Sequence, residues 1–161
     1  MFGDDIDPES CHHMTQIRTA TIADLPPLVP LFDGYRQFYR HPPDEKAARE
    51  FLAARFAAKD SVIYVAAEAD HSLSGFVQLY PLWSSTRLKR LWLLNDLYVH
   101  PAHRGRHISK LLIGRCISLA RDTGACGLQL ETQKSNLIGN SLYRQQGFVL
   151  SGENFYFLKT D

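Results

Sequence analysis

One run of the sequence constrains the fold more than any other. An apolar strand leads through a basic turn into an amphipathic helix and then into a second strand. The pattern predicts these elements over residues 88–99, 104–122 and 126–132. A helix that connects two neighbouring strands of one sheet returns the chain to its starting edge, so the two strands run parallel. Any fold of this chain must therefore contain a parallel pair of strands.

The rest of the chain predicts antiparallel strands and further helices around this pair. Asp24 and Asp44 each precede residues at helical spacing, and Gly147 ends a short helix expected over residues 136–146. Further strands are expected where apolar residues alternate or run together, at residues 15–21, 61–68, 75–82, 148–151 and 154–160. The order β-α-α-β-β-β-α-β-α-β-β predicts an α/β fold with a mixed sheet and helices on both faces.

The size and composition of the chain fit one compact domain. Its 161 residues are 45% hydrophobic, which is enough to bury a substantial core. Residues 1–13 lack periodicity and are expected to form a disordered or extension tail before a single domain over residues 14–161. No secretion signal is evident, and the three cysteines form no CxxC pair, which favours a reducing cytoplasm. No apolar run is long enough to span a membrane.

Charge is spread unevenly along the chain. The net charge of +1 argues against a general nucleic-acid-binding protein, which would carry a strong basic excess. Residues 87–115 hold seven basic residues and one acidic residue, whereas residues 1–60 hold seven basic and ten acidic residues. The basic stretch suits an anionic ligand, and the acidic stretch suggests a cationic acceptor such as an amine.

The basic turn before the long helix predicts a phosphate site. The first N–H groups of a helix have no intrahelical partner, and the helix dipole adds partial positive charge there. Arg104, Arg106 and Lys110 add formal charge beside them. Such loops normally carry glycines where this one has His107 and Ser109. Because backbone N–H groups bind the phosphate, neither side chain forbids binding.

A second group of polar residues follows the second strand of the parallel pair. Glu131 ends that strand, Asn136 opens the next helix, and Tyr143 lies on this helix. Ligands of α/β proteins bind at the carboxyl ends of the strands. The three side chains are therefore expected at the same edge of the sheet as the basic turn.

Two motifs at this separation resemble those of a known family. L-Y-V-x-P-x-x-R-G-R covers residues 97–106, and E-x-x-x-x-N-x-x-x-x-x-L-Y-x-x-x-G-F covers residues 131–148. Both are similar to motifs of the GNAT superfamily of acetyl-CoA-dependent N-acetyltransferases, and the order of elements after Met14 resembles its fold. The pyrophosphate loop of the family reads Arg/Gln-x-x-Gly-x-Gly/Ala, so His107 and Ser109 replace two small residues. Gly139 stands where the family often has alanine.

The resemblance implies a fold and a reaction. The central sheet would be mixed and mostly antiparallel, with a bulge that splays the parallel pair and helices on both faces. Acetyl-CoA would be the acyl donor, a primary amine of a small molecule or protein would attack it directly in a ternary complex, and no metal would be needed. The family's CoA-binding residues correspond here to Leu97, Tyr98, Val99, Arg104, Gly105, Arg106, His107, Ile108, Ser109, Lys110, Asn136 and Tyr143.

The resemblance also implies catalytic roles. The backbone N–H of Leu97 would face the acetyl carbonyl oxygen, and Tyr143 would protonate the departing thiolate. Asp96 and Glu131 are the candidate bases for the amine. The structural alternatives are packing for Tyr143 and an ion pair for Glu131.

The acceptor side of the site is less defined by the sequence. Tyr35 and Tyr39 on the first helix are candidates for receiving an alkylammonium group, with packing as the alternative. Glu131 is a further candidate for substrate contact. Asn136, assigned to CoA, could equally act as the cap of its helix.

Three other interpretations compete with this one. His100, His103 and His107 lie close enough in sequence to suggest metal binding, although no HExxH pattern accompanies them. The substituted loop also fits a non-catalytic acyl-CoA sensor, or a transferase that uses a larger acyl-CoA. A homodimer is expected, because the strand over residues 154–160 is apolar enough to pair across an interface.

Overall fold

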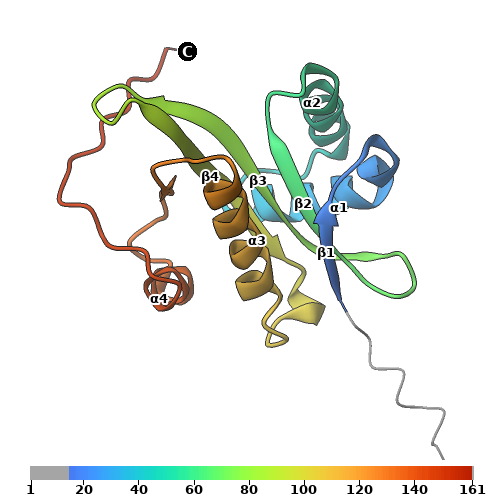
Figure 1. The fold of residues 1–161 in the computed structure, drawn as a ribbon. Coiled ribbons are helices and arrows are strands. Elements are labelled where there is room, and N and C mark those ends of the chain that lie inside the picture. The colour runs from blue at the N-terminus through green and yellow to red at the C-terminus, as the bar shows by residue number, and fades with distance from the viewer. Residues whose placement is uncertain (1–14, 161) are drawn as a thin grey trace, which may run out of the picture. The chain divides into compact units, whose positions relative to one another are not determined.

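The computed structural model describes residues 15–160 of the chain (Figure 1). The tail expected over residues 1–13 lies outside these residues. The chain divides into two compact units, of which the first ends at Leu130 and the second begins at Glu131. None of the helices within residues 15–160 is long and apolar enough to cross a membrane. A single domain over residues 14–161 stays a prediction.

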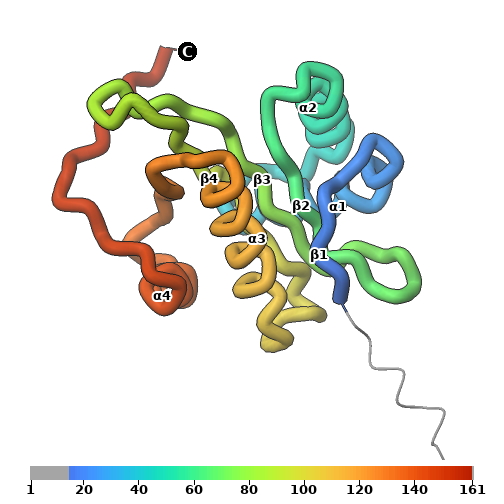
Figure 2. The backbone as a smooth tube through the Cα atoms, viewed as in Figure 1, coloured from blue at the N-terminus to red at the C-terminus, as the bar shows by residue number. Residues whose placement is uncertain are grey.

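The first unit is built on a five-stranded sheet in the order β1-β2-β3-β4-β5. Its strands, which can be followed in the tube of Figure 2, are β1 (Gln16–Thr19), β2 (Val62–Ala67), β3 (Leu73–Ser84), β4 (Lys89–Val99) and β5 (Leu128–Gln129). Neighbouring strands are antiparallel except β4 and β5, which are parallel. The mixed, mostly antiparallel sheet predicted from the sequence is confirmed.

Two helices between β1 and β2 pack on one face of the sheet. α1 (Leu25–Phe38) follows the 3-10 turn η1 (Ile22–Asp24), and α2 (Glu45–Ala58) follows Asp44. The Asp44 carboxylate accepts a hydrogen bond from the backbone N–H of Ala47 at 2.9 Å, as an N-cap residue does. The core on this face consists of Ala20, Leu28, Val29, Leu31, Phe32, Ala48, Leu52, Ile63, Val65, Ala67, Leu73 and Phe76.

A third helix, α3 (Ile108–Asp122), connects β4 to β5 and covers the opposite face (Figure 1). The guanidinium group of Arg115 on α3 lies over the ring of Tyr64, 5.0 Å from its centroid. Adjacent side chains of a strand point to opposite faces, so Tyr64 faces α3 while Val65 faces α1. Helices therefore lie on both faces, as predicted.

α3 begins four residues later than the sequence pattern predicts. The helix is expected from residue 104, but Arg104 is extended, with ψ 157°. Gly105 and His107 have φ values of 81° and 60°, which do not continue a right-handed helix. The residues before α3 instead form the 3-10 turn η2 (Pro101–His103) and a tight turn.

The strands predicted after α3 are shorter than expected or absent within residues 15–160. β5 covers two residues instead of 126–132, since β4 pairs with it only at Trp92 and Leu93. The sheet pairings of the described residues do not include 148–151 or 154–160. Val149 and Phe157 there are 91% and 81% exposed. An apolar pattern makes a strand only where a hydrogen-bonded neighbour exists.

The second unit carries one helix, α4 (Leu137–Gln145), close to the predicted range 136–146. The helix ends where Gly147 adopts a φ of 89°, and the Phe148 N–H donates to the Tyr143 carbonyl at 3.0 Å. Glycine favours this left-handed position because it has no Cβ to clash. The predicted role of Gly147 in ending this helix is confirmed.

Candidate active site

A bulge in β4 is the centre of the site. Gln78 of β3 pairs with Asp96, but the next residue of β3, Leu79, pairs with Leu94. Asn95 is therefore an extra residue without a partner in this register. A bulge bends its strand and redirects the side chains beside it. β4 thus changes direction where the predicted catalytic residues begin.

Asp96 lies buried beside the bulge. It is 5% exposed, and Asn95 Nδ2 donates to its Oδ1 at 3.0 Å. Burial raises the pKa of the Asp96 carboxyl, and hydrogen bonds from Asn95 and Tyr35 oppose this shift in part. A carboxylate with a raised pKa is a better base near neutral pH than a solvated one. One of the two candidate bases thus has an environment typical of functional groups.

β4 loses its parallel neighbour after Leu93. The pairing with β5 consists of Trp92 with Leu128 and Leu93 with Gln129. On this side of β4, the strands of the described residues give no partner to residues 97–99. An extended ligand that carries amides can add to such an edge through backbone hydrogen bonds.

The turn after β4 has the backbone shape of a glycine-containing loop. His107 is the N-cap residue of α3 and lies in the left-handed region, with φ 60° and ψ 13°. Glycine adopts this region without strain, so His107 keeps the conformation of the small residue that it replaces. Its side chain makes no capping hydrogen bond to the first turn. Because no side chain of the described residues caps α3, its first backbone N–H groups can donate hydrogen bonds to an anion.

Arg106 anchors this turn to β2 and to the residue before β1. Its Nη2 donates to Glu68 Oε2 at 2.9 Å and to Thr15 Oγ1 at 3.0 Å, and its Nη1 lies 2.7 Å from His103 Nδ1. Burial opposes ionisation of Glu68, but hydrogen bonds from Ser74, Arg106 and Thr15 outweigh burial and lower its pKa. The guanidinium group of Arg106 therefore holds the turn in position. Since this side chain is already engaged, a phosphate would be bound by the backbone N–H of Arg106 rather than by its side chain.

Sequence reasoning missed Glu68 and Thr15 as parts of this site. Glu68 directly follows β2 and is separated from Arg106 by 38 positions in the sequence. Neither residue belongs to a motif or shares a helical or strand period with the turn. The one available signal was a carboxylate directly after a buried strand, which is common at strand ends.

Arg104 packs back onto β4. Its Nε donates to the Val99 carbonyl at 3.2 Å, and its guanidinium group lies 5.8 Å from the centroid of the Tyr98 ring. The Tyr98 ring also reaches α1, where a Cβ on Gly34 would lie 3.0 Å from the Tyr98 hydroxyl. The absent side chain at Gly34 permits this approach. Three residues predicted to bind CoA, at positions 98, 99 and 104, thus lie together.

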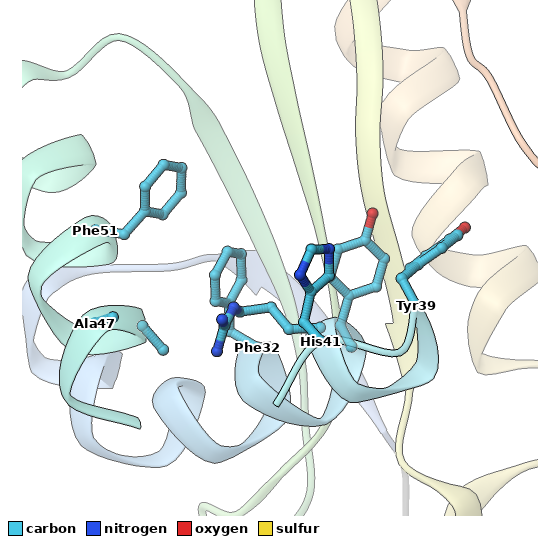
Figure 3. Close-up of a pocket in the computed structure, with 8 residues that line it drawn as sticks. Phe32, Tyr39, His41, Ala47 and Phe51 are labelled. Carbon is cyan, nitrogen blue, oxygen red and sulfur yellow. The ribbon is translucent and has the colours of Figure 1, made fainter. Parts of the chain in front are cut away.

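Tyr35 connects α1 to the bulge. Its hydroxyl donates to the Asn95 carbonyl at 3.3 Å, and its ring lies 6.4 Å from the Tyr98 ring and 5.1 Å from the Tyr39 ring. Tyr35 and Tyr39 both line a pocket between α1 and α2 (Figure 3). Two of the three residues predicted to contact substrate therefore lie in one pocket, and Tyr35 links this pocket to the residue beside Asp96.

The model of the acetyltransferase (GNAT) family matches residues 28–148, a range that includes most of α1, the bulge, the basic turn and α4. The chain belongs to the GNAT acetyltransferase family. The resemblance stated from the two motifs is thereby confirmed.

Individual GNAT proteins support this assignment. The chain is 40% identical over 132 residues to an uncharacterized N-acetyltransferase, YhfO, of Bacillus subtilis (strain 168), covering 82% of this chain and 88% of the relative. A crystal structure of a probable acetyltransferase has a TM-score of 0.86 at 36% identity, covering 91% and 99% of the two chains. An aminoglycoside N-acetyltransferase in complex with CoA shares the fold at 18% identity, with a TM-score of 0.77 and coverage of 92% and 97%.

The second GNAT motif lies in the second unit. Asn136 is the N-cap of α4, because its Oδ1 accepts from the Gly139 N–H at 3.0 Å and its Nδ2 donates to Thr132 Oγ1 at 3.0 Å. A Cβ on Gly139 would lie 2.5 Å from Asn136 Nδ2. This cap explains glycine at a position where GNAT proteins often have alanine. The structural interpretation of Asn136 is confirmed, and its contact with CoA stays a prediction.

Tyr143 and Glu131 belong to the same unit. Tyr143 is half-buried on α4, with its ring 5.8 Å from that of Phe148 in an edge-to-face arrangement. Glu131 is exposed at the start of the unit. The roles of both residues in the GNAT reaction stay predictions.

The histidines of the competing metal interpretation, and the buried cysteine on α3, have other surroundings in this GNAT structure. Residues 15–160 contain no group of three or more His, Cys, Asp or Glu side chains placed to hold a metal ion. His100 Nδ1 accepts from the Ala102 N–H at 3.2 Å, and His103 Nδ1 contacts Arg106. Burial raises the pKa of the Cys116 thiol to about 12, so this thiol is protonated and unreactive at neutral pH.

Proposed function

We propose that this GNAT protein moves an acetyl group from acetyl-CoA to a primary amine of a small molecule or protein, by direct attack in a ternary complex. The observation that carries the proposal is the buried Asp96 at the β4 bulge. It is followed by residues 97–99, which β5 leaves unpaired, and by the start of α3, whose first N–H groups suit an anion. A base, a site for an extended amide chain and a site for phosphate thus follow one another along the chain.

The donor would lie along β4 and the turn after it. The backbone N–H groups between Arg104 and Lys110 would bind the pyrophosphate, because a helix start attracts an anion and this turn has the required left-handed residues. The amides of the pantetheine arm would pair with Val99, and Asn136 would also contact that arm while it caps α4. The complex of a structural neighbour with CoA supports this choice of donor.

The acceptor would enter as an ammonium group and lose a proton to Asp96, directly or through water. Its nitrogen would then attack the thioester carbon, forming a C–N bond and a tetrahedral oxyanion. The Leu97 N–H would donate a hydrogen bond to that oxyanion. In other enzymes, one such donor contributes about 2.7–4 kcal/mol to transition-state stabilisation.

Collapse of the oxyanion would break the C–S bond. The Tyr143 hydroxyl would protonate the leaving thiolate, and the nitrogen would lose its second proton as the amide forms. An ammonium ion and a thioester thus give an amide, a thiol and one proton. The protonated Cys116 supports direct attack rather than an acetyl-cysteine intermediate. Glu131 remains the second candidate base.

Calorimetry with acetyl-CoA and a thiol-release assay over a panel of amines together test the proposal. We expect wild type to bind acetyl-CoA in about the micromolar range and to release CoA thiol only when an amine is present. Tyr143→Phe should bind acetyl-CoA like wild type and turn over more slowly.

The two alternatives predict different results in the same assays. A non-catalytic sensor would bind acetyl-CoA without thiol release for any amine, and Tyr143→Phe would change nothing. A transferase for a larger acyl group would release thiol faster from a longer acyl-CoA than from acetyl-CoA. Failure of every CoA thioester to bind would contradict the proposed function.

A further inference from the structure

The pocket between α1 and α2 has a volume of about 520 Å³ and belongs entirely to the first unit. In Figure 3, Phe32 and Tyr39 come from α1 and its end, Ala47 and Phe51 from α2, and His41 from the connection between the helices. The full lining is Phe32, Tyr35, Arg36, Tyr39, His41, Ala47, Ala48 and Phe51. This volume suits a small molecule of amino-acid size or somewhat larger.

Aromatic rings form much of the wall. Phe32 and Phe51 stack with ring centroids 5.4 Å apart and an interplanar angle of 15°. Tyr35 lies 6.2 Å from Phe32 and meets Tyr39 edge to face at 5.1 Å. Phe51 is nevertheless 39% exposed, so part of its ring is open to a ligand. An aromatic or apolar body would bury surface against these rings.

The pocket lining carries basic side chains but no acidic ones. Arg36 and His41 line the pocket, and none of the eight lining residues is acidic. Arg36 is held by the buried Asp33, whose Oδ1 accepts from Arg36 Nη1 at 2.7 Å, and the same Nη1 contacts the Pro42 carbonyl at 3.4 Å. Both bonds use one of the three guanidinium nitrogens, so this cation is fixed in place and keeps donors for a carboxylate.

Among residues 15–60, no acidic side chain lines this pocket. Asp24 is engaged by Arg18 at 2.7 Å, and this pair lowers the pKa of Asp24 to about 2. Asp33 is buried, and it accepts from Gln37 and Arg36. A polycation would find two basic side chains and no lining carboxylate here, which costs binding energy. The charge of the pocket lining thus differs in sign from the net charge of residues 1–60.

Tyr35 joins this pocket to the predicted chemistry. Its ring is part of the lining, and its hydroxyl donates to the carbonyl of Asn95, the residue beside Asp96. An acceptor whose body lies in the pocket could therefore extend its amine past Tyr35 toward the Asp96 carboxylate. The basic groups, Arg36 and His41, would meet an anionic group on the same molecule.

We infer that the acceptor is an aromatic monoamine that also carries an anionic group, as an aromatic amino acid does. The inference rests on the proposed function, since it names the acceptor of that reaction. Phe32 and Phe51 would bind the ring, Arg36 and His41 the carboxylate, and Asp96 the amine. Polyamines and aminoglycosides are disfavoured as acceptors.

Three amines that differ in their aromatic ring and carboxylate test the assignment of the acceptor. L-Phenylalanine has ring, amine and carboxylate, phenethylamine lacks the carboxylate, and spermidine is a polycation without a ring. With saturating acetyl-CoA, we expect kcat/KM to fall by about tenfold or more from phenylalanine to phenethylamine, since charge-assisted bonds to the carboxylate are lost. Spermidine should be the poorest of the three.

Variants assign the selectivity to the pocket. Phe51→Ala should raise KM for phenylalanine about tenfold with little change in kcat. His41→Gln should reduce the preference for phenylalanine over phenethylamine. Trp83→Ala, which removes an aromatic side chain that is 71% exposed outside the pocket, is the matched control and should change neither value.

A binding measurement separates failure of this inference from failure of the proposed function. N-Acetyl-L-phenylalanine, titrated by calorimetry without acetyl-CoA, should bind wild type and bind Phe51→Ala more weakly. If this compound binds but no amine is acetylated, the pocket is a site for aromatic carboxylates, and the proposed function falls together with the acceptor assignment. If amines are acetylated and spermidine is preferred, or the three amines are equal, the proposed function stands and this inference is overturned. Absence of both binding and transfer overturns both.

Discussion

Burial of the Asp96 carboxyl group makes its ionised form a stronger base, but it also makes that ionised form less favourable for folding. Because its pKa is raised in the folded protein, its favourable contribution to folding is complete below its unfolded pKa, which is near 3.9. That contribution is lost as pH rises through the folded pKa. The same rise in pH produces the carboxylate that can accept a proton from the amine. Asp96 thus contributes least to the stability of the fold when it is ionised, and the ionised form is the one that acts as a base.

Asp96→Asn should separate these two effects. We expect kcat to fall by about 10² to 10⁴, the usual contribution of a general base. The free energy of unfolding of the variant, relative to wild type, should increase from pH 4 to pH 8, because the variant has no carboxylate to desolvate. Urea unfolding across this range and kcat at each pH measure both. Glu50→Gln on the exposed side of α2 is the control, and an unchanged kcat in Asp96→Asn would assign the base to Glu131 or to solvent.

His107 occupies a left-handed backbone conformation that normally favours glycine. The sequence indicates a lost glycine, and the structure shows that its conformation, with φ 60°, has been kept. A non-glycine residue in this region costs about 1 kcal/mol or more. The physical consequence of the substitution is therefore local strain rather than a changed loop.

Glycine substitutions at His107 and Ser109 should have opposite effects on stability. His107→Gly relieves the left-handed strain and should raise the free energy of unfolding by up to about 1 kcal/mol. Ser109→Gly places glycine in the first turn of α3 and should lower it by about 0.5 kcal/mol. Thermal unfolding of the two single variants compares them. A loss of stability in His107→Gly would mean that the imidazole makes contacts that offset the strain.

At the scale of elements, the turn before α3 is attached to β2 by the Arg106–Glu68 ion pair. The lowered pKa of Glu68 means that the pair stabilises the fold above the unfolded pKa of a glutamate, and that this contribution is lost as pH falls through the folded pKa. Glu68→Gln should lower stability at pH 7 by about 1 to 2 kcal/mol, a modest value because the Arg106 side chain is 37% exposed. It should also weaken acetyl-CoA binding.

A double-mutant cycle distinguishes this anchoring role from a direct contact with CoA. Arg106→Met alone and Glu68→Gln alone each leave one partner unpaired, so the double variant should lose less than the sum of the two. The same non-additivity should appear in the Kd for acetyl-CoA. Additive losses in Kd would show that Arg106 contacts the donor directly.

The element scale also shows what sequence patterns can and cannot predict. The helical periods of α1 and α2 were readable because each helix buries one face, and β2 and β3 were readable as runs of apolar residues that are buried on both faces. Asp44 and Gly147 mark helix ends by local chemistry. The late start of α3 depends on positive φ values at Gly105 and His107. The conformational propensity of histidine does not predict the second of these values. The Arg106–Glu68 pair depends on tertiary approach between distant segments, and the pocket depends on how two helices pack.

At the scale of the whole molecule, the segment after α4 is the least expected feature. Its alternation predicts two strands, but none of the described strands includes it, and its large apolar side chains are exposed. They are Val149, Leu150, Phe155, Tyr156, Phe157 and Leu158. The sequence shows that such a segment favours an extended conformation. It does not show which strand the segment would pair with.

A homodimer would bury this segment. Exposed apolar residues in succession are usually covered by a partner, and an extended segment can pair with a sheet edge of a second copy. We expect the purified chain to be a dimer by light scattering at micromolar concentration. Phe155→Lys with Phe157→Lys should shift it toward monomer, since both side chains, 68% and 81% exposed here, would become charged in the interface. The matched control, Arg87→Glu with Lys89→Glu, changes charge on the other unit and should leave the mass unchanged. A monomeric wild type would contradict the dimer and leave the apolar segment to be covered within one chain.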